Sequence, residues 1–247
     1  MSTALADFAI PKITLPETDG EPFDSPWHRD EIQLLIESVH CHFVGRTDFY
    51  VGGNMFIYYS VEQVRNREYR GPDFFYVNGV DRTRSRLYWA VWEENGKYPD
   101  VIIELLSHST AKEDRTTKKA IYEKTFRTPE YFLYDPETRT LEGWRLAGRT
   151  YQRIQPDERG WLWSEELGLW LGTWEGEYLG EDATWLRFYD PEGRLVLLAA
   201  EGERGRVETE RQRAMVERQR ADAERQRAEA AEAEVARLKA QLSAKTT

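Results

Sequence analysis

The chain has 247 residues and a formal net charge of −10, which allows one sizeable domain and an appended segment. Residues 201–247 hold 11 basic and 10 acidic side chains, so the acidic excess belongs to residues 1–200. An acidic domain argues against broad non-specific duplex binding, although a local basic groove stays compatible with it. Cys41 is the single cysteine, and no apolar run approaches transmembrane length. These features predict a cytoplasmic protein with no internal disulfide and no membrane partner.

The N-terminal part of the sequence predicts one helix followed by short strands. Residues 1–26 predict an irregular arm. The next segment, Trp27–Val44, has apolar residues at helical spacing, with Asp24 or Ser25 as its cap. Strands are expected at Phe49–Val51, Met55–Tyr59, Gly71–Val77 and Arg86–Trp92, and a loop or short helix at Val61–Tyr69. His28, His40 and His42 do not predict zinc, because no second close ligand set accompanies them.

The central stretch, Tyr98–Pro136, predicts a strand, a helix and a second strand. The first strand is an apolar run, Val101–Leu106, with one acid, Glu104, inside it. A carboxylate in a buried strand is costly unless a partner compensates it. In the following helix Asp114, Lys118 and Tyr122 recur at i, i+4 and i+8, which places them along one face. The second strand is expected at Tyr131–Tyr134.

Asp73 lies at the start of another apolar run, so two carboxylates occupy two predicted strands. If the strands for Asp73 and Glu104 are neighbours, the two acids form an oxygen site for a hard divalent cation. Lys118 would place a positive charge beside that site. Asp100 begins the Glu104 strand and shares its face, but lies about 13 Å away by strand rise. Capping or an accessory water contact is therefore expected for Asp100 rather than metal ligation.

After Pro136 the sequence predicts β structure and then a long helix. Thr140–Leu146 and Thr150–Ile154 flank Ala147-Gly148 as a hairpin. Further strands are expected at Trp161–Trp163, Leu169–Leu171, Trp185–Tyr189 and Arg194–Leu198. From about Glu201 the composition favours a helix in which the motif ERQRA recurs every seven residues. The register that places Ala214, Ala221, Ala228, Val235 and Leu242 at one core position puts Glu217 and Glu224 at the other. Such a seam is small and partly polar, which predicts a weak coiled coil or a solvated single helix.

Five linked motifs within roughly residues 25–200 carry a family resemblance: Pro72-Asp73, Glu104-Leu-Leu-Ser107-x-Ser109-Thr110, Asp114-x₃-Lys118-x₃-Tyr122, Pro129-Glu130-Tyr131 and Asp135-Pro136. Together they resemble the Uma2 family of restriction endonuclease-like proteins, within the PD-(D/E)xK nuclease superfamily. The resemblance implies an α/β fold with a mixed sheet flanked by helices and acids near its centre.

The sequence departs from the usual nuclease motif at two positions. Leu106 stands where the motif has its lysine, two residues after the second acid, and the resemblance implies that Lys118 on the helix replaces it. Lys119 is the neighbouring alternative, but it turns to another helix face. His108 stands where the family often has proline, in a loop that leaves both acids in place.

The resemblance implies an Mg²⁺- or Mn²⁺-dependent DNA endonuclease in residues 1–200. Asp73 and Glu104 would hold the metal, Lys118 would be the catalytic cation, and Asp114 and Tyr122 would support them. An alternative remains open. Asp73, Glu104 and Lys118 would then form a buried ion-pair cluster in a protein that has lost catalysis. Such a chain would bind nucleic acid or protein and assemble as a homo-oligomer through residues 201–247.

Overall fold

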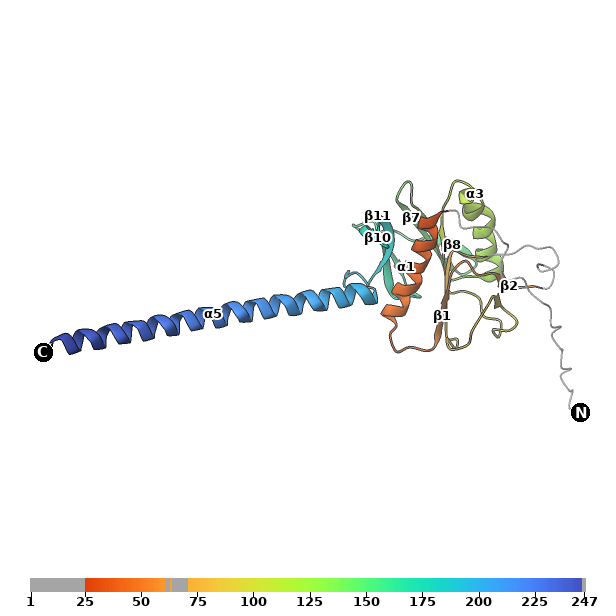
Figure 1. Ribbon diagram of the computed structural model, residues 1–247. Coiled ribbons are helices and arrows are strands. Elements are labelled where there is room, and N and C mark those ends of the chain that lie inside the picture. Colours follow the sequence, from red (N-terminus) through yellow and green to blue (C-terminus); the bar gives the residue numbers. More distant parts are fainter. Residues whose placement is uncertain (1–24, 61–62, 64–70, 246–247) are drawn as a thin grey trace, which may run out of the picture. The chain divides into compact units, whose positions relative to one another are not determined.

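The computed structural model describes residues 25–60, Gln63 and residues 71–245 (Figure 1). Almost all of the arm expected at residues 1–26 lies outside the described residues. So does the loop or short helix expected at Val61–Tyr69, apart from Gln63. The chain divides into two compact units, Met1–Val196 and Leu197–Thr247.

A six-stranded mixed sheet forms the centre of the first unit. Its order is β1-β3-β5-β6-β7-β8, and only the pair of β5 and β6 is parallel. The strands are β1 (Phe49–Gly52), β3 (Phe74–Asn78), β5 (Val101–Leu105), β6 (Glu130–Asp135), β7 (Thr140–Ala147) and β8 (Thr150–Arg153). The expected α/β class with a mixed sheet is confirmed, and the expected hairpin is β7–β8.

Two smaller sheets accompany the central one. An antiparallel sheet contains β9 (Leu162–Ser164), β10 (Leu169–Tyr178) and β11 (Glu181–Tyr189), and a parallel pair joins β2 (Ile57–Tyr58) to β4 (Trp89–Ala90). The strand predicted at Arg194–Leu198 is wrong, because among the described residues its ladder pairing is limited to a single bridge between Leu195 and Tyr189. A tight turn follows β11, and the C-terminal helix begins at Ala199.

Two apolar cores lie on opposite faces of the central sheet because side chains alternate along each strand. On one face, Ile103 packs with α1 (Pro26–His42) and with the β9–β11 sheet. Ser25 caps α1, its side chain accepting a hydrogen bond from the backbone N of His28. On the other face, Ile102 packs with Tyr122 from the segment after β5. Figure 1 shows α1 and the segment beginning with α3 on opposite sides of the sheet.

The helical segment between β5 and β6 is not the uniform α-helix that the sequence predicts. It consists of α3 (Ala111–Glu113), η1 (Asp114–Lys118), α4 (Lys119–Ile121) and η2 (Tyr122–Phe126), in which η1 and η2 are π-helical. It ends at Arg127, which adopts the left-handed region with φ of 56°. π-Helical turns are rare and often occur at functional sites, and both turns here contain residues of the candidate site.

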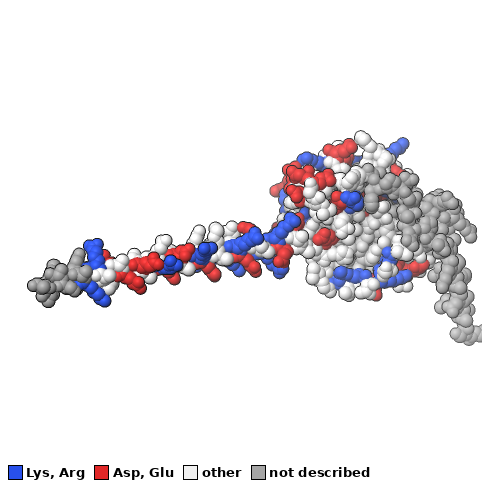
Figure 2. All heavy atoms as spheres, in the orientation of Figure 1, with Lys and Arg blue, Asp and Glu red and all other residues white. Residues whose placement is uncertain are grey.

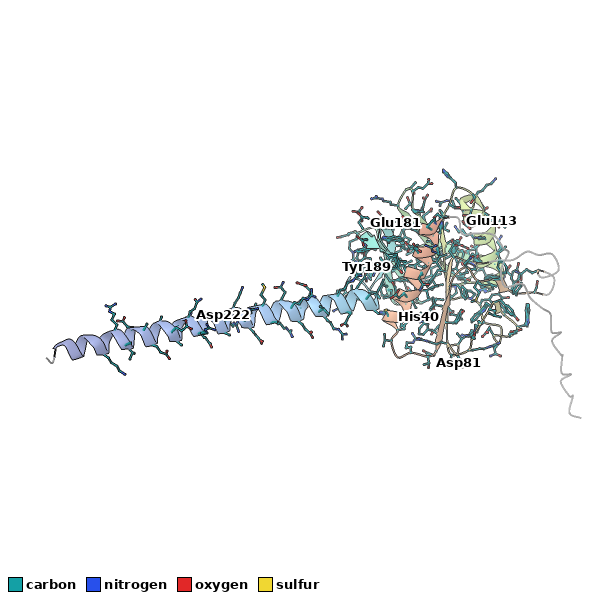
Figure 3. All side chains as sticks on the ribbon, in the orientation of Figure 1. His40, Asp81, Glu113, Glu181, Tyr189 and Asp222 are labelled. Carbon is teal, nitrogen blue, oxygen red and sulfur yellow. The ribbon has the colours of Figure 1, made fainter. Side chains whose placement is uncertain are left out.

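The second unit is dominated by one helix, α5 (Ala199–Lys245). Every side chain described from Glu203 onward is exposed, and Figure 3 shows side chains projecting all around the helix, including Asp222. Acidic and basic side chains alternate along it (Figure 2). Weak self-association through the heptads of α5 stays a prediction. No helix within the described part of the chain has the length and apolar character needed to cross a membrane.

Candidate active site

The two acids singled out in the sequence are neighbours across the β3–β5 pair. Phe74 pairs with Ile103 in the antiparallel register, so Asp73, which directly precedes β3, lies beside Glu104. The backbone N of Asp73 donates to Glu104 Oε2 at 3.3 Å. The backbone N of Leu105 donates to Asp73 Oδ2 at 2.7 Å. Each carboxylate is therefore held by the backbone of the opposite segment.

Lys118 joins this pair from the helical segment. Its Nζ lies 3.2 Å from Glu104 Oε2 and 2.7 Å from Asp114 Oδ1. Glu104 is fully buried and Asp114 almost so, whereas the Lys118 side chain keeps 16% of its surface exposed. One lysine thus neutralises two buried carboxylates in part, and its side chain is not completely buried.

Two tyrosines complete the support. The Tyr122 hydroxyl donates to Glu104 Oε1 at 2.8 Å, and the Tyr131 hydroxyl donates to the backbone carbonyl of Asp114 at 2.9 Å. Tyr122 is also buried in the apolar core below. Tyr122 therefore combines packing with a direct contact to the candidate metal ligand.

The electrostatic state of the cluster follows from burial and from crowding of like charges. Burial raises the pKa of Glu104 to about 8, with Lys118 opposing the rise and Asp73 and Asp114 adding to it. Burial also raises the pKa of Asp73 above its ordinary value. Burial works to lower the pKa of Lys118, but the carboxylates of Glu104, Asp114 and Asp73 outweigh it and raise the pKa further. The lysine is thus charged at neutral pH, while the carboxyl groups compete for it.

The donor set of the cluster fits a hard divalent cation. Asp73 and Glu104 offer carboxylate oxygens, and Asp114 adds a third negative charge close to Glu104. Mg²⁺ is commonly held by one or two carboxylates, with water and substrate phosphate completing its shell. Among the described residues no group of three or more His, Cys, Asp and Glu side chains is arranged to hold a metal. Any ion here would therefore depend on those non-protein ligands.

Three other residues considered from the sequence lie outside the cluster. Asp100 is at the opposite end of β5, where its Oδ2 accepts a hydrogen bond from the backbone N of Asn78 at 2.7 Å. Lys119 turns away and places its Nζ 3.6 Å from the centre of the Trp144 ring. His108 lies on the loop after β5 with its side chain 94% exposed.

His28 is a further neighbour of the site. From the sequence it has no assigned role, because the histidines do not predict a zinc site. Its Nε2 lies 3.3 Å from the carbonyl oxygen of Leu105, and its Nδ1 lies 2.9 Å from Ser25 Oγ. It reaches the end of β5 from the first turn of α1. This contact spans 77 positions in sequence, and no local pattern of residues signals it.

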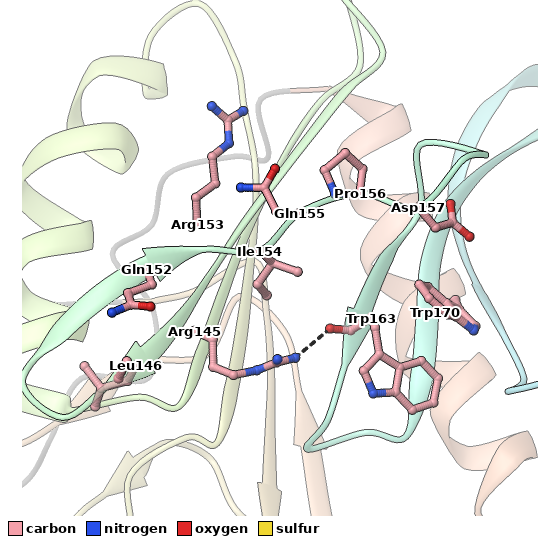
Figure 4. A pocket seen from close by; sticks show the side chains of 11 residues that line it. Arg145, Leu146, Gln152, Arg153, Ile154, Gln155, Pro156, Asp157, Trp163 and Trp170 are labelled. Carbon is pink, nitrogen blue, oxygen red and sulfur yellow. Dashed lines mark hydrogen bonds between the residues drawn. The ribbon is translucent and has the colours of Figure 1, made fainter.

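Two pockets are relevant to the location of the cluster. The first, of about 510 Å³, is lined by His28, by Leu106 and Ser107 just after β5, and by residues after β6 and on β11. The second, of about 420 Å³, lies between the β7–β8 hairpin and the β9–β10 strands (Figure 4). Only the first borders the segment that follows Glu104. Ligands of α/β proteins commonly bind at the carboxyl ends of parallel strands, which is where the first pocket lies.

Comparison with known families identifies the relatives of this chain. The Uma2 family, described as "Putative restriction endonuclease", matches residues 7–175. The chain belongs to the Uma2 family. The match contains Asp73, Glu104 and Lys118, so the resemblance carried by the sequence motifs is confirmed.

One solved structure is similar in fold to part of this chain. A crystal structure from Anabaena variabilis, described as that of "a putative nuclease", aligns with a TM-score of 0.44 and 12% sequence identity. The alignment covers 63% of this chain and 87% of the other. No curated protein matches the Uma2 chain described here.

Proposed function

We propose that this Uma2 protein is a metal-dependent endonuclease that hydrolyses phosphodiester bonds in DNA, using Mg²⁺ or Mn²⁺. The observation that carries the proposal is the convergence of Asp73, Glu104 and Lys118, with the lysine ammonium 3.2 Å from Glu104 Oε2. Two carboxylates and one partly exposed cation on adjacent elements are the groups that metal-assisted phosphodiester hydrolysis requires.

Each residue of the cluster has a role that its contacts support. Asp73 and Glu104 would hold the ion, which supplies Lewis-acid polarisation of the phosphate and activation of a water nucleophile. Tyr122 and the backbone N of Asp73 fix the two oxygens of Glu104. Asp114 holds the Lys118 ammonium at 2.7 Å, so that its charge is positioned to stabilise the negative charge developing on the phosphate.

A binding protein without catalysis is the second candidate function. It is favoured by the pairing of Glu104, whose oxygens contact Lys118, Tyr122 and the backbone N of Asp73. A buried, paired carboxylate can be purely structural. On this alternative the cluster stabilises the fold, and the exposed helix α5 provides the contact surface.

Plasmid cleavage distinguishes the two functions. Purified full-length protein should nick or linearise supercoiled plasmid with Mg²⁺ or Mn²⁺ and should be inactive with EDTA. Glu104→Gln, which keeps the shape of the side chain, should abolish the cleavage. Absence of cleavage by folded wild-type protein with either metal would favour the binding protein. Equal cleavage by Glu104→Gln would remove this residue from the mechanism.

A further inference from the structure

The pocket that borders the segment after Glu104 has features that the hydrolytic mechanism does not use. It is formed where the first turn of α1 meets the segments following β5 and β6 and the strand β11. His28 connects it to the cluster, because the same ring lines the pocket and lies 3.3 Å from the carbonyl of Leu105, the residue after Glu104. The pocket and Glu104 thus both lie at the carboxyl end of β5.

The wall of the pocket contains a rigidly held aromatic ring. Trp27 is half-buried and stacks on Trp185, with ring centres 5.8 Å apart and planes 14° from parallel. Tyr134 packs against the same ring at 6.1 Å. A flat ring held in this way loses little entropy when a ligand stacks on it, and proteins use such rings as platforms for unpaired bases.

The charged groups around the pocket disfavour a phosphate as its occupant. Glu137 contributes a carboxylate to the lining. Arg139, the lining arginine, is paired with Glu175 at 2.8 Å, and His108 lies 3.8 Å from Glu137. Arg139 and His108 therefore each lie near a carboxylate. A neutral, planar ligand with hydrogen-bonding edges suits this lining better than an anion.

We propose that this pocket receives an unpaired nucleobase next to the phosphate that is cleaved, stacked on Trp27. The inference rests on the proposed nuclease function and identifies the substrate more closely, as a strand with at least one unstacked base. A volume of about 510 Å³ is within the usual range for small-molecule sites. Extrusion of a base costs least at single-stranded or mismatched positions, so such substrates should bind best.

Photocrosslinking tests the pocket in the unaltered protein. A single-stranded oligonucleotide carrying 5-iodouracil is bound to full-length wild-type protein with Ca²⁺ in place of Mg²⁺, and a gel confirms that the strand stays intact. After irradiation, peptide mass mapping should find the crosslink at Trp27. Crosslinks confined to Trp163 or Trp170, which line the other pocket, would overturn the assignment. Failure of the oligonucleotide to bind at all would also overturn it.

A pair of variants measures the contribution of the ring. Trp27→Leu should weaken binding of a 2-aminopurine oligonucleotide roughly tenfold, the usual effect of losing one stacked base, and should abolish quenching of the base. Trp163→Leu is the matched control, a half-buried tryptophan lining the other pocket, and should bind as the wild type does. Equal binding by Trp27→Leu and wild type would contradict the proposal. If Trp27→Leu does not fold, the crosslink decides.

The outcomes separate this inference from the nuclease function. Binding that depends on Trp27, without cleavage in Mn²⁺, would support the nucleobase pocket and contradict the nuclease function. Cleavage by wild-type protein with no crosslink at Trp27 would support the nuclease function and contradict the nucleobase pocket.

Discussion

Two glutamates in neighbouring parallel strands are both fully buried, yet their surroundings differ. Glu130, at the start of β6, accepts hydrogen bonds from Arg145 at 2.9 and 3.0 Å, from Ser164, and from the backbone N of Glu165 and Glu166. These partners come from β7 and from the end of β9 onward, so Glu130 joins the central sheet to the β9–β11 sheet.

Glu104, near the end of β5, has fewer hydrogen-bonding and charged partners than Glu130, and its lysine is shared with another acid. It shares a single lysine with Asp114 and lies beside a third carboxylate, Asp73. Glu130 instead faces the guanidinium of Arg145, whose Nε and Nη2 both donate to Glu130 Oε1, and charge-assisted hydrogen bonds of this kind are strong. The comparison shows that burial of an acid does not by itself indicate a site. An excess of buried carboxylates over cations favours a bound metal ion. At Lys118 both paired carboxylates are buried, whereas Glu165, the second carboxylate on Arg145, is 61% exposed.

The largest expected effect comes from removing the shared lysine. Lys118→Met keeps the stem and deletes the charge, so cleavage should fall by roughly a hundredfold or more. Two buried carboxylates also lose their counter-ion, so the free energy of unfolding should decrease. Plasmid cleavage should be measured at a temperature where circular dichroism shows the variant to be folded. Lys119→Met is the matched control, since that lysine packs on Trp144. Loss of cleavage in Lys119→Met alone would mean that the wrong lysine has been chosen.

Glu130→Gln tests whether Glu130 has a structural role and no role in metal binding. Weakening its charge-assisted hydrogen bonds should lower the free energy of unfolding by about 2 kcal/mol, measured by urea denaturation. Affinity for Mn²⁺ should remain within about twofold of wild type, because Glu130 is not part of the cluster. A loss of Mn²⁺ affinity comparable to that of Glu104→Gln would contradict the distinction between the two glutamates.

The pKa of Glu104 predicts how metal binding depends on pH. A carboxyl group with a pKa near 8 must release its proton before it binds metal, so Mn²⁺ affinity should rise about tenfold per pH unit up to that value. Without metal the free energy of unfolding should change in the opposite direction and decrease as the pH rises. The contribution of protonated Glu104 is complete below its unfolded pKa of about 4.5 and is lost as the pH rises through 8. Mn²⁺ titrations between pH 6 and 9 would check this, with Glu104→Gln as the control. An affinity independent of pH in the wild type would show that Glu104 is already ionised.

The smallest effect is expected from removing α5. A chain shortened to residues 1–198 should cleave DNA within about threefold of the full chain, since the cluster lies wholly in the first unit. Self-association through the alanine-rich seam should be weak, because alanine buries little apolar area. Sedimentation velocity of both chains would measure it. A stable oligomer that dissociates on truncation and loses cleavage would give the helix a larger role than proposed here.

The sequence predicts those parts of the site that depend on local patterns. Glu104 is an acid inside an apolar run, and Asp114, Lys118 and Tyr122 share a helix face, so each can be found from its neighbours in the chain. The π-helical turns at η1 and η2 leave no such signal, because the same residues suit an α-helix.

Contacts between distant segments cannot be predicted in this way. His28 meets Leu105 across 77 positions, and Glu130 finds Ser164 across 34. Both contacts depend on how α1 and the β9–β11 sheet pack on the central sheet. From sequence, Glu104 and Glu130 both appear as acids in family motifs, and only their partners distinguish them.

Calorimetric titration of Mn²⁺ into the wild type, Glu104→Gln and Glu130→Gln tests whether Asp73 and Glu104 bind a metal ion together. We expect Mn²⁺ to bind the wild type and Glu130→Gln with similar affinity. Binding to Glu104→Gln should be at least tenfold weaker, because one of the two carboxylate ligands is lost. Equal affinity in all three proteins would contradict the claim that Asp73 and Glu104 form a metal site.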